Sequence, residues 1–323
     1  NVLGWVTFAI SSIVYLMTME PTASFWDCGE FISSAYKLEV GHPPGAPFFM
    51  LTANLFTQFA SNPSQVAVMV NSMSALFSGL TILFLFWSIT HLARRILVNE
   101  GEEISNSQLI TIMGSGLVGA LAYTFSDTFW FSAVEGEVYA YSSLFTAVVF
   151  WLILKWEAVA DKPHADRWMV LIAYLMGLSI GVHLLNLLCI PAIVLVYYYK
   201  KYPNPTLKGT FVALFISFAI IAVMMYGVVQ GLVEVCGWFE LLFVNGMGMP
   251  YNSGVFAYVV VLLGVIAWAI YETMTSNPNK VRMNIAFILS VTLIGIPFIG
   301  SGYVIGILLI AALTAYLFLS KRT

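Results

Sequence analysis

Residues 20–47, which read EPTASFWDCGEFISSAYKLEVGHPPGAP, decide how the rest of the sequence is interpreted. They form a polar stretch between apolar runs, in a chain of 323 residues of which 60% are hydrophobic and only 9% are charged. Soluble domains carry about 25% charged residues, whereas the mean hydropathy here is +0.90. We therefore predict an integral membrane protein. Ionisable side chains at a membrane boundary are costly to desolvate, so this stretch is the first place to look for function.

Working outward, about 20 apolar residues are needed to span the hydrocarbon. The sequence predicts an all-α polytopic membrane protein, one domain over 1–323, with about ten spans and the first outer loop, 20–64, as its functional platform. We expect 44–60 to form an interfacial helix, because it is short and follows two prolines. The runs at 168–182 and 184–199 are short, so they form either two spans or a broken, re-entrant hairpin. The predicted spans lie near 2–19, 66–93, 108–126, 138–156, 168–182, 184–199, 209–229, 254–274, 283–299 and 303–319.

The basic residues give the predicted orientation. With a cytoplasmic N-terminus, every Lys and Arg except Lys37 falls on the cytoplasmic side. Because cytoplasmic loops are enriched in Lys and Arg, we expect both ends of this chain in the cytoplasm and the loop 20–64 outside. The chain begins without Met and ends directly after an apolar run, so we expect it to be part of a longer protein.

Several classes of protein are disfavoured by what the sequence lacks. There is no basic patch for nucleic acid, and there is no phosphate-binding Walker loop, GxSxG or HExxH motif. The three cysteines show no metal-ligand spacing. Cys28 and Cys236 both fall on the predicted outer side, which leaves two alternatives: isolated thiols, which we favour, or a disulfide.

Two acids lead the candidate site. Asp27 and Glu30 are three residues apart and share one face if the segment is helical. A carboxylate at the membrane surface could act as general base on an acceptor hydroxyl. The alternative is structural, because acids in a first helical turn interact favourably with the helix dipole, by about 0.3–1 kcal/mol.

Basic groups on the same side are few. The turn GHPPG at 41–45 is rigid and would hold His42 at the outer surface. Lys37, His42 and His183 are the basic candidates there for a phosphate-bearing donor. Either these three hold the phosphate, or a divalent cation bridges it to the acids.

Two further segments supply polar groups. In VEGEVY, Glu135 and Glu137 are two apart, so we expect one to cap the following helix and the other to face a cavity. In GVHLLN, His183 and Asn186 lie where two short helices meet, and broken helices at membrane depth occur where they line a cavity or are buried in protein. The alternative for the second pair is hydrogen bonding between helices.

As a set, these motifs resemble a known family. The sequence TASFWDCGEF at 22–31, GHPPG at 41–45, EGEVYA at 135–140 and GVHLLN at 181–186 follow the order seen in the membrane portion of large bacterial proteins related to the vertebrate transmembrane protein O-mannosyltransferases. These belong to the GT-C glycosyltransferases, which use polyprenyl- or dolichyl-phosphate sugars. The resemblance implies a GT-C-like helix bundle with its active site on the outer side and a soluble C-terminal region beyond this chain.

Carried onto this chain, the resemblance implies Asp27 as general base and Glu30 as its orienting partner. Lys37, His42 and His183 would bind the donor phosphate, while Glu135, Glu137 and Asn186 would contact acceptor or sugar. The expected activity is transfer of a sugar, mannose first, from a polyprenyl-phosphate carrier to Ser or Thr of an exported protein at the bacterial inner membrane, with membrane lipid, lipid-linked donor and acceptor protein as partners. The rivals are a transporter or flippase of lipid-linked substrates and a structural subunit of an envelope assembly.

Overall fold

The computed structural model describes residues 1–99, 101–275, 279–298 and 303–319. Within these residues the chain is helical and contains no strand, which confirms the prediction of an all-α polytopic membrane protein. The chain divides into two compact units, residues 1–214 and 215–323. The expected single domain over 1–323 stays a prediction.

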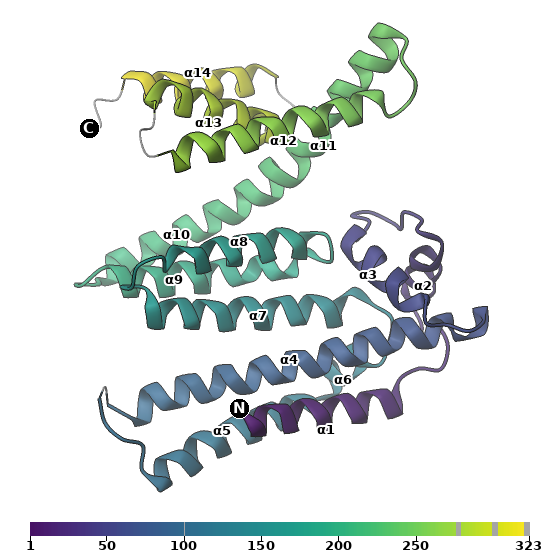
Figure 1. The fold of residues 1–323 in the computed structure, drawn as a ribbon, viewed down its shortest axis with the longest axis vertical. Helices are drawn as coiled ribbons and strands as arrows, with labels where there is room; N and C mark the ends of the chain where they lie inside the picture. The colour runs from purple at the N-terminus through teal and green to yellow at the C-terminus, as the bar shows by residue number, and fades with distance from the viewer. Residues whose placement is uncertain (100, 276–278, 299–302, 320–323) are drawn as a thin grey trace. The chain divides into compact units, whose positions relative to one another are not determined.

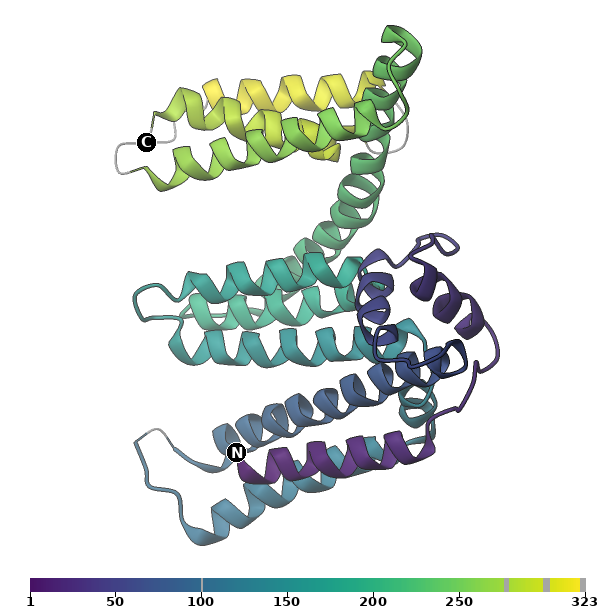
Figure 2. The same ribbon diagram turned by 45° about the vertical axis from the view of Figure 1, so that its right-hand side comes forward.

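The first unit is organised around one long central helix, α4. Helices α1 and α5 pack on one side of α4 and α7 on another, with α8 and α9 packed against α7 (Figure 1). Helices α2 and α3 pack on each other beside the start of α4 (Figure 2). The helices of this unit are α1 (Val2–Thr18), α2 (Cys28–Lys37), α3 (Pro47–Thr57), η1 (Pro63–Gln65), α4 (Val66–Leu97), α5 (Asn106–Thr124), α6 (Asp127–Ala133), α7 (Val138–Val159), α8 (Asp166–Ile180), η2 (Leu184–Cys189), α9 (Ile190–Lys201) and the start of α10 (Leu207–Ala222).

Close approach of α1 and α4 depends on small residues. A side chain on Gly79 would collide with Ser12, and both residues face the contact between the two helices. Small residues are typical of contacts between membrane helices. In lipid no hydrophobic driving force brings two helices together, so their association depends on close packing of the backbones. Tyr15 is fully buried, and its hydroxyl donates to the carbonyl of Thr124, 2.8 Å away, which ties α1 to the end of α5.

The predicted spans are helical over most of their described residues, but their lengths differ; residue 299, which ends the run 283–299, lies outside the described residues. Asn106–Thr124 and Asp127–Ala133 pass the same test for length and hydropathy together but are bent by 68°. Other predicted spans are shorter apolar helices, such as Val2–Thr18. Between α8 and α9 the α-helix is interrupted, as expected for a broken hairpin, by residues 181–183 and the 3-10 helix η2. Five helices of the described residues are long and apolar enough to cross a membrane: Pro63–Leu97, Val138–Val159, Leu184–Lys201, Leu207–Gly246 and Ser253–Met274.

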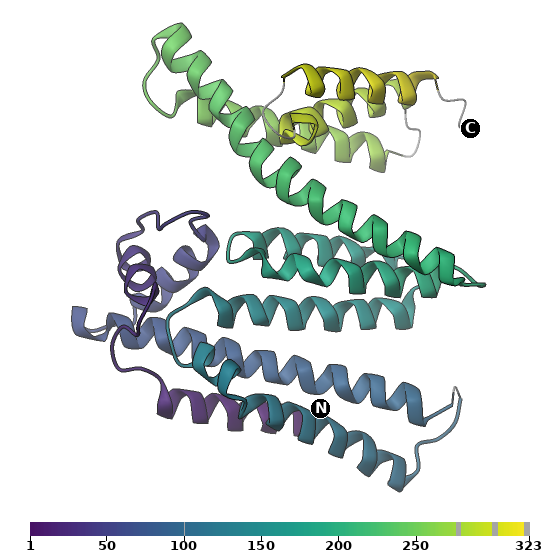
Figure 3. The same ribbon diagram turned by 180° about the vertical axis from the view of Figure 1, so that it is seen from behind.

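The second unit packs α11 on α12, α12 on α13 and α13 on α14 (Figure 3). The helix that begins at Leu207 runs on to Gly246 through π-helical turns. Both carboxylate oxygens of Glu240 accept backbone N–H groups, from Asn252 at 2.6 Å and Val255 at 3.0 Å, so this acid has a structural role. The helices are η3 (Val223–Val229), α11 (Gln230–Leu241), η4 (Leu242–Gly246), α12 (Ser253–Met274), α13 (Lys280–Ile294), η5 (Ile296–Phe298) and α14 (Tyr303–Leu319).

Candidate active site

The start of α2 presents two acids in different ways. Asp27 occupies the position just before the helix, but its side chain makes no capping hydrogen bond and is exposed. Glu30 lies in the first turn and reaches across to the GHPPG turn. A carboxylate placed only to cap the helix would accept N–H groups of its own first turn. Neither acid does so, which weakens the purely structural interpretation of this pair.

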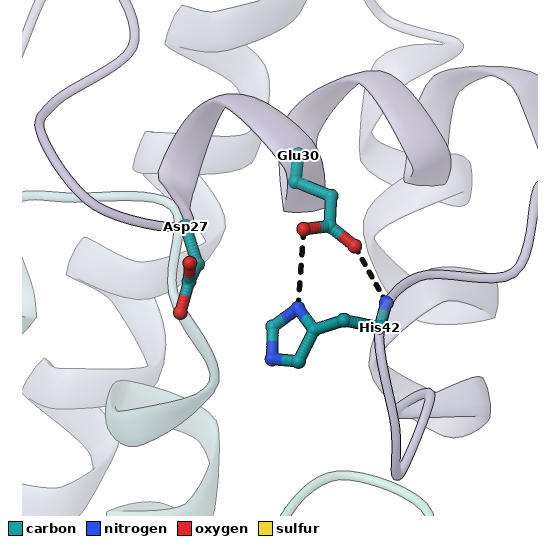
Figure 4. A group of neighbouring side chains, drawn as sticks. All are labelled: Asp27, Glu30 and His42. Atoms are coloured by element: carbon teal, nitrogen blue, oxygen red, sulfur yellow. Dashed lines mark hydrogen bonds and ion pairs between the residues drawn. The ribbon is translucent and has the colours of Figure 1, made fainter.

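Glu30 contacts His42 at two points (Figure 4). One carboxylate oxygen accepts the backbone N–H of His42 at 2.5 Å, and the other lies 3.1 Å from the ring nitrogen Nδ1. These hydrogen bonds, the backbone one first, hold the pKa of Glu30 below its ordinary value. In return, the hydrogen bond to Glu30 raises the pKa of His42. The carboxylate therefore fixes the ring and favours its protonated form, and it leaves Nε2 free on the side of the ring where Asp27 lies.

The turn that carries His42 is anchored to the break between α8 and η2. Gly45 and Ala46 take positive φ angles of 90° and 40°, a region that glycine enters without strain. Helix α3 then starts at Pro47, and the free N–H of Phe48 donates to the carbonyl of Gly181 at 2.7 Å. This contact brings the first loop against residues that lie far away in the sequence.

His183 stands at that break. Its Nδ1 accepts the backbone N–H of Leu185 at 3.1 Å, so the neutral ring carries its proton on Nε2. Burial lowers the pKa of His183, which favours this neutral form. The ring lies against Tyr139, with 5.4 Å between the ring centroids. His183 is thus a neutral N–H donor, whereas His42 is held in a setting that favours the cation.

The segment 134–139 separates its two acids, and one of them, Glu137, faces a cavity as expected. The expected helix cap is wrong, because the Glu137 side chain makes no capping hydrogen bond and Glu135 bonds to Cys28 instead. Glu135 is buried and accepts from the Cys28 thiol at 3.5 Å, beneath α2. Glu137 lies at the start of α7 and lines the cavity described next. Burial raises the pKa of both carboxyls, that of Glu137 to about 7, with a further contribution from the negative charge of Glu135. Both acids lie outside the membrane-spanning part of α7, and Glu137 titrates near neutrality.

A small cavity joins these segments. Its volume is about 90 Å³, which is room for about three water molecules at roughly 30 Å³ each. A ligand larger than this would extend beyond the cavity. The cavity is lined by Asp27, Phe31, His42, Pro44, Gly45, Ala46, Glu137, Val138, Tyr139, Val182 and His183.

Four of the eight predicted site residues do not line the cavity, and of these only Glu30 reaches it, through its hydrogen bonds to His42. Lys37 is exposed in the last turn of α2 and does not line the cavity. Glu135 is turned toward Cys28. Asn186 is fully buried, where it donates to the Ser179 hydroxyl at 2.8 Å and accepts from Thr146 at 3.3 Å. The structure therefore places Asn186 in hydrogen bonds between helices, which was the alternative raised for it.

A cation could be held by the exposed group of Asp27, Glu30 and His42. One potential ligand atom from each residue lies within 4.8 Å of the others. Two carboxylates and an imidazole are a donor set that divalent metals accept. Glu30 and Nδ1 of His42 already bond to each other, so a cation would have to replace that contact.

All three cysteines are free thiols, as favoured above.

Two residues of the site were missed in the sequence. Tyr139 lines the cavity beside His183. Asn71, fully buried in α4, donates to the carbonyls of Glu20 at 2.7 Å and Thr22 at 3.0 Å and so holds the start of the first loop. A polar residue inside an apolar span is a signal for Asn71, because such residues are retained where they have a partner. Tyr139 gave no signal of its own.

Comparison with known proteins places these features in a family. Residues 27–206 match the family described as the protein O-mannosyl-transferase TMEM260 N-terminal domain. The chain is 28% identical over 185 residues to protein O-mannosyl-transferase tmem260 of Dictyostelium discoideum, which is 55% of this chain and 20% of that protein. It is 28% identical over 174 residues to its Mus musculus counterpart, covering 54% of this chain and 22% of the relative. The aligned part is thus about a fifth of each relative's length, and no solved structure matches the chain.

Proposed function

The chain belongs to the TMEM260 N-terminal domain family, and on that basis we propose that it transfers a sugar, mannose first, from a polyprenyl-phosphate carrier to Ser or Thr of an exported protein. The relation to the transmembrane protein O-mannosyltransferases that its motifs predicted is confirmed. A GT-C type of mechanism, the lipid carrier and the sugar are parts of the proposal, and so is the whole protein's activity.

The observation that carries this proposal is the convergence of Asp27, His42, Glu137 and His183 on one cavity. They come from four segments, the start of α2, the GHPPG turn, the start of α7 and the break after α8. Acids with a purely structural role would accept backbone N–H groups at helix ends, as Glu240 does in the second unit. Asp27, by contrast, makes no capping bond and stands exposed at the cavity.

In the proposed reaction the Asp27 carboxylate accepts the proton of the acceptor hydroxyl. The hydroxyl oxygen forms a bond to the anomeric carbon while the bond from that carbon to the phosphate oxygen breaks, and its electron pair leaves with the lipid phosphate. Phosphate is a weakly basic leaving group, so it needs charge stabilisation more than protonation. Attack from the face opposite the phosphate inverts the anomeric centre.

The two histidines are the donors that suit the departing phosphate. His183 offers a neutral N–H, because its Nδ1 already accepts the N–H of Leu185. His42 offers Nε2 on a ring whose pKa is raised by Glu30. Glu137 is left to bind hydroxyl groups of the sugar or acceptor, since its carboxyl is partly protonated near neutral pH and can then both donate and accept.

The proposal puts this site on the outer side of the membrane, the periplasmic side of an inner membrane if the host is bacterial. In the first unit, Arg94, Arg95, Lys155, Lys200 and Lys201 lie where α4, α7 and α9 end, away from α2 and α3 (Figure 1). Lys37 alone among the Lys and Arg of residues 1–214 lies on α2. Basic ends of spans favour the cytoplasm, which supports an outward site.

The test is transfer of mannose from synthetic polyprenyl-phosphate-mannose to a Ser/Thr-rich peptide by the full natural polypeptide in membranes. Loss of a general base costs about 10²–10⁴-fold, so we expect Asp27→Asn to lower the rate by at least about 100-fold. Asp127→Asn is the matched control, because Asp127 is also an exposed acid at the start of a helix, α6.

Full transfer by Asp27→Asn would remove Asp27 from the mechanism. A wild-type protein that gives no product with any of several sugars, yet moves labelled lipid between leaflets, would establish the flippase alternative instead.

A further inference from the structure

A second, larger cavity lies in the first unit, where α1 begins and α4 and α7 end. It is lined by residues of α1, α4, α5 and α7 and by Ile104, which precedes α5. Its volume of about 550 Å³ falls within the roughly 300–1,000 Å³ typical of ligand sites. None of the candidate active-site residues lines it.

The two cavities are separated by the thickness of a membrane. Asn71 of α4 holds the start of the first loop, and a side chain on Gly136 would meet its Oδ1 at 2.9 Å, so Asn71 marks the level of the active site. His91 of the same helix lines the second cavity. Twenty residues at 1.5 Å each give about 30 Å, which equals the hydrocarbon thickness of about 30 Å. The second cavity thus lies at the opposite headgroup layer.

The charged side chains that line this cavity are of one sign. Arg94 and Lys155 line it, and no Asp or Glu is among the described residues that do. In the part of the chain that the structure describes, neither cation forms an ion pair, whereas the neighbouring Arg95 is paired with Glu157. Glu102 and Glu157 line an adjoining cavity that shares His91 and Arg94. Since Arg94 and Lys155 form no ion pair with any described acid, these two cations can bind an anion.

Uncharged groups near the two cations could also contribute to binding an anion. The ring nitrogens Nε1 of Trp87 and Nε2 of His91 are buried, and neither has a hydrogen-bond partner among the described residues. The Lys155 ammonium lies over the ring of Trp151, 5.0 Å from its centroid. Trp5, also part of the lining, is half exposed. Tryptophan at a span end typically lies at the level of the lipid headgroups.

From this arrangement we propose that the cavity binds the phosphoryl group of an anionic membrane lipid through Arg94 and Lys155, with the tryptophans beside the glycerol and upper acyl chain. Basic pockets between spans on the cytoplasmic side suit lipid headgroups. A free phosphate anion shares this chemistry, and the test separates the two sources. The site is independent of the sugar-transfer proposal.

The experiment counts lipids bound to the full natural polypeptide by native mass spectrometry while phosphatidylglycerol or phosphatidylcholine is titrated. Each Lys or Arg near an anionic lipid strengthens the binding of that lipid substantially. The double variant Arg94→Gln with Lys155→Gln should therefore weaken phosphatidylglycerol binding about tenfold or more. The control is Lys162→Gln with Lys208→Gln, which removes equal charge where α7 has ended and α10 begins. Arg94→Lys with Lys155→Arg should keep most of the binding, which shows that the substituted sites tolerate change.

Three results would overturn the proposal. Equal losses in the double variant and in the control would mean that only general charge attracts the lipid. Equal binding of phosphatidylcholine and phosphatidylglycerol would remove the anion from the recognition. Displacement of phosphatidylglycerol by millimolar pyrophosphate, with pyrophosphate bound in its place, would make the ligand a soluble phosphate and not a lipid.

Discussion

The two acid pairs of the first unit use the same residue types in opposite ways. Asp27 and Glu30 are exposed at the start of α2, and hydrogen bonds from His42 lower the pKa of Glu30. Glu135 and Glu137 are buried before α7, and burial raises the pKa of both. Glu30 therefore stays charged near neutral pH, whereas Glu135 and Glu137 hold protons to higher pH. Solvent access and partners, rather than residue type, set this difference.

The contrast also assigns different tasks. Carboxylates that stay ionised can accept a proton and can fix an imidazole, as Glu30 fixes His42. A carboxyl with a pKa of about 7, as in Glu137, is present in both forms near neutrality and can bind hydroxyl groups in either form. The predictions below test whether this division between the pairs is real, beginning with the largest effect after that of Asp27→Asn.

Replacing Glu30 should break the exposed pair. Glu30→Gln removes the charge that orients His42 and raises its pKa. We expect about tenfold slower transfer, less than the roughly 10²–10⁴-fold loss for a general base, because Glu30 acts through His42. Because the pKa of His42 then falls, the alkaline limb of the rate profile should move to lower pH. Rates measured from pH 5 to 9 check both effects. Glu39→Gln, an exposed acid just after α2, is the control. A profile unchanged in Glu30→Gln would contradict the role of the pair.

Replacing Glu137 should remove the titration of the buried pair. The folded-state pKa of about 7 lies above the ordinary 4.5, so the native state binds more protons than the unfolded state between these values. Stability therefore falls as pH rises from about 4.5 through about 7. Glu137→Gln is free of this penalty, which is on the order of 3 kcal/mol for a pKa raised from 4.5 to about 7, so it should melt several °C higher than wild type at pH 8. At pH 4 the two proteins should melt at the same temperature. Thermal unfolding at both pH values provides the check.

Glu135→Gln separates fold from activity within the buried pair. Glu135 bonds to Cys28 and does not line the active-site cavity. We expect a changed melting temperature but a transfer rate within about twofold of wild type, whereas Glu137→Gln should slow transfer severalfold. Similar losses of activity in both variants would show that the cavity does not distinguish the two acids.

The smallest effect should come from Lys37. This residue was expected to bind donor phosphate, yet it is exposed in the last turn of α2 and away from the cavity lining. Lys37→Gln should change the Michaelis constant for the lipid-linked donor by less than about twofold, as for a solvated surface charge. An increase of tenfold would restore Lys37 to the donor site.

The sequence by itself determined the membrane class, the helical fold and the elements that carry the chemistry. Apolar runs fixed where helices form, because backbone groups in lipid must bond within the segment. Prolines and glycines in GHPPG and GVHLLN marked the two irregular segments correctly. The two-residue spacing of Glu135 and Glu137 was enough to predict that they point apart.

Only the tertiary structure decided which polar groups meet. His183 joins the site because Gly181 accepts the N–H of Phe48, while Asn186, three residues on, turns toward Ser179 and Thr146. Lys37 falls outside the cavity because α2 carries it one helix length from Asp27. Each of these outcomes depends on contacts between segments far apart in the chain. Local sequence encodes helix positions through hydrophobicity and backbone preference, but distances and pKa values follow from packing and burial.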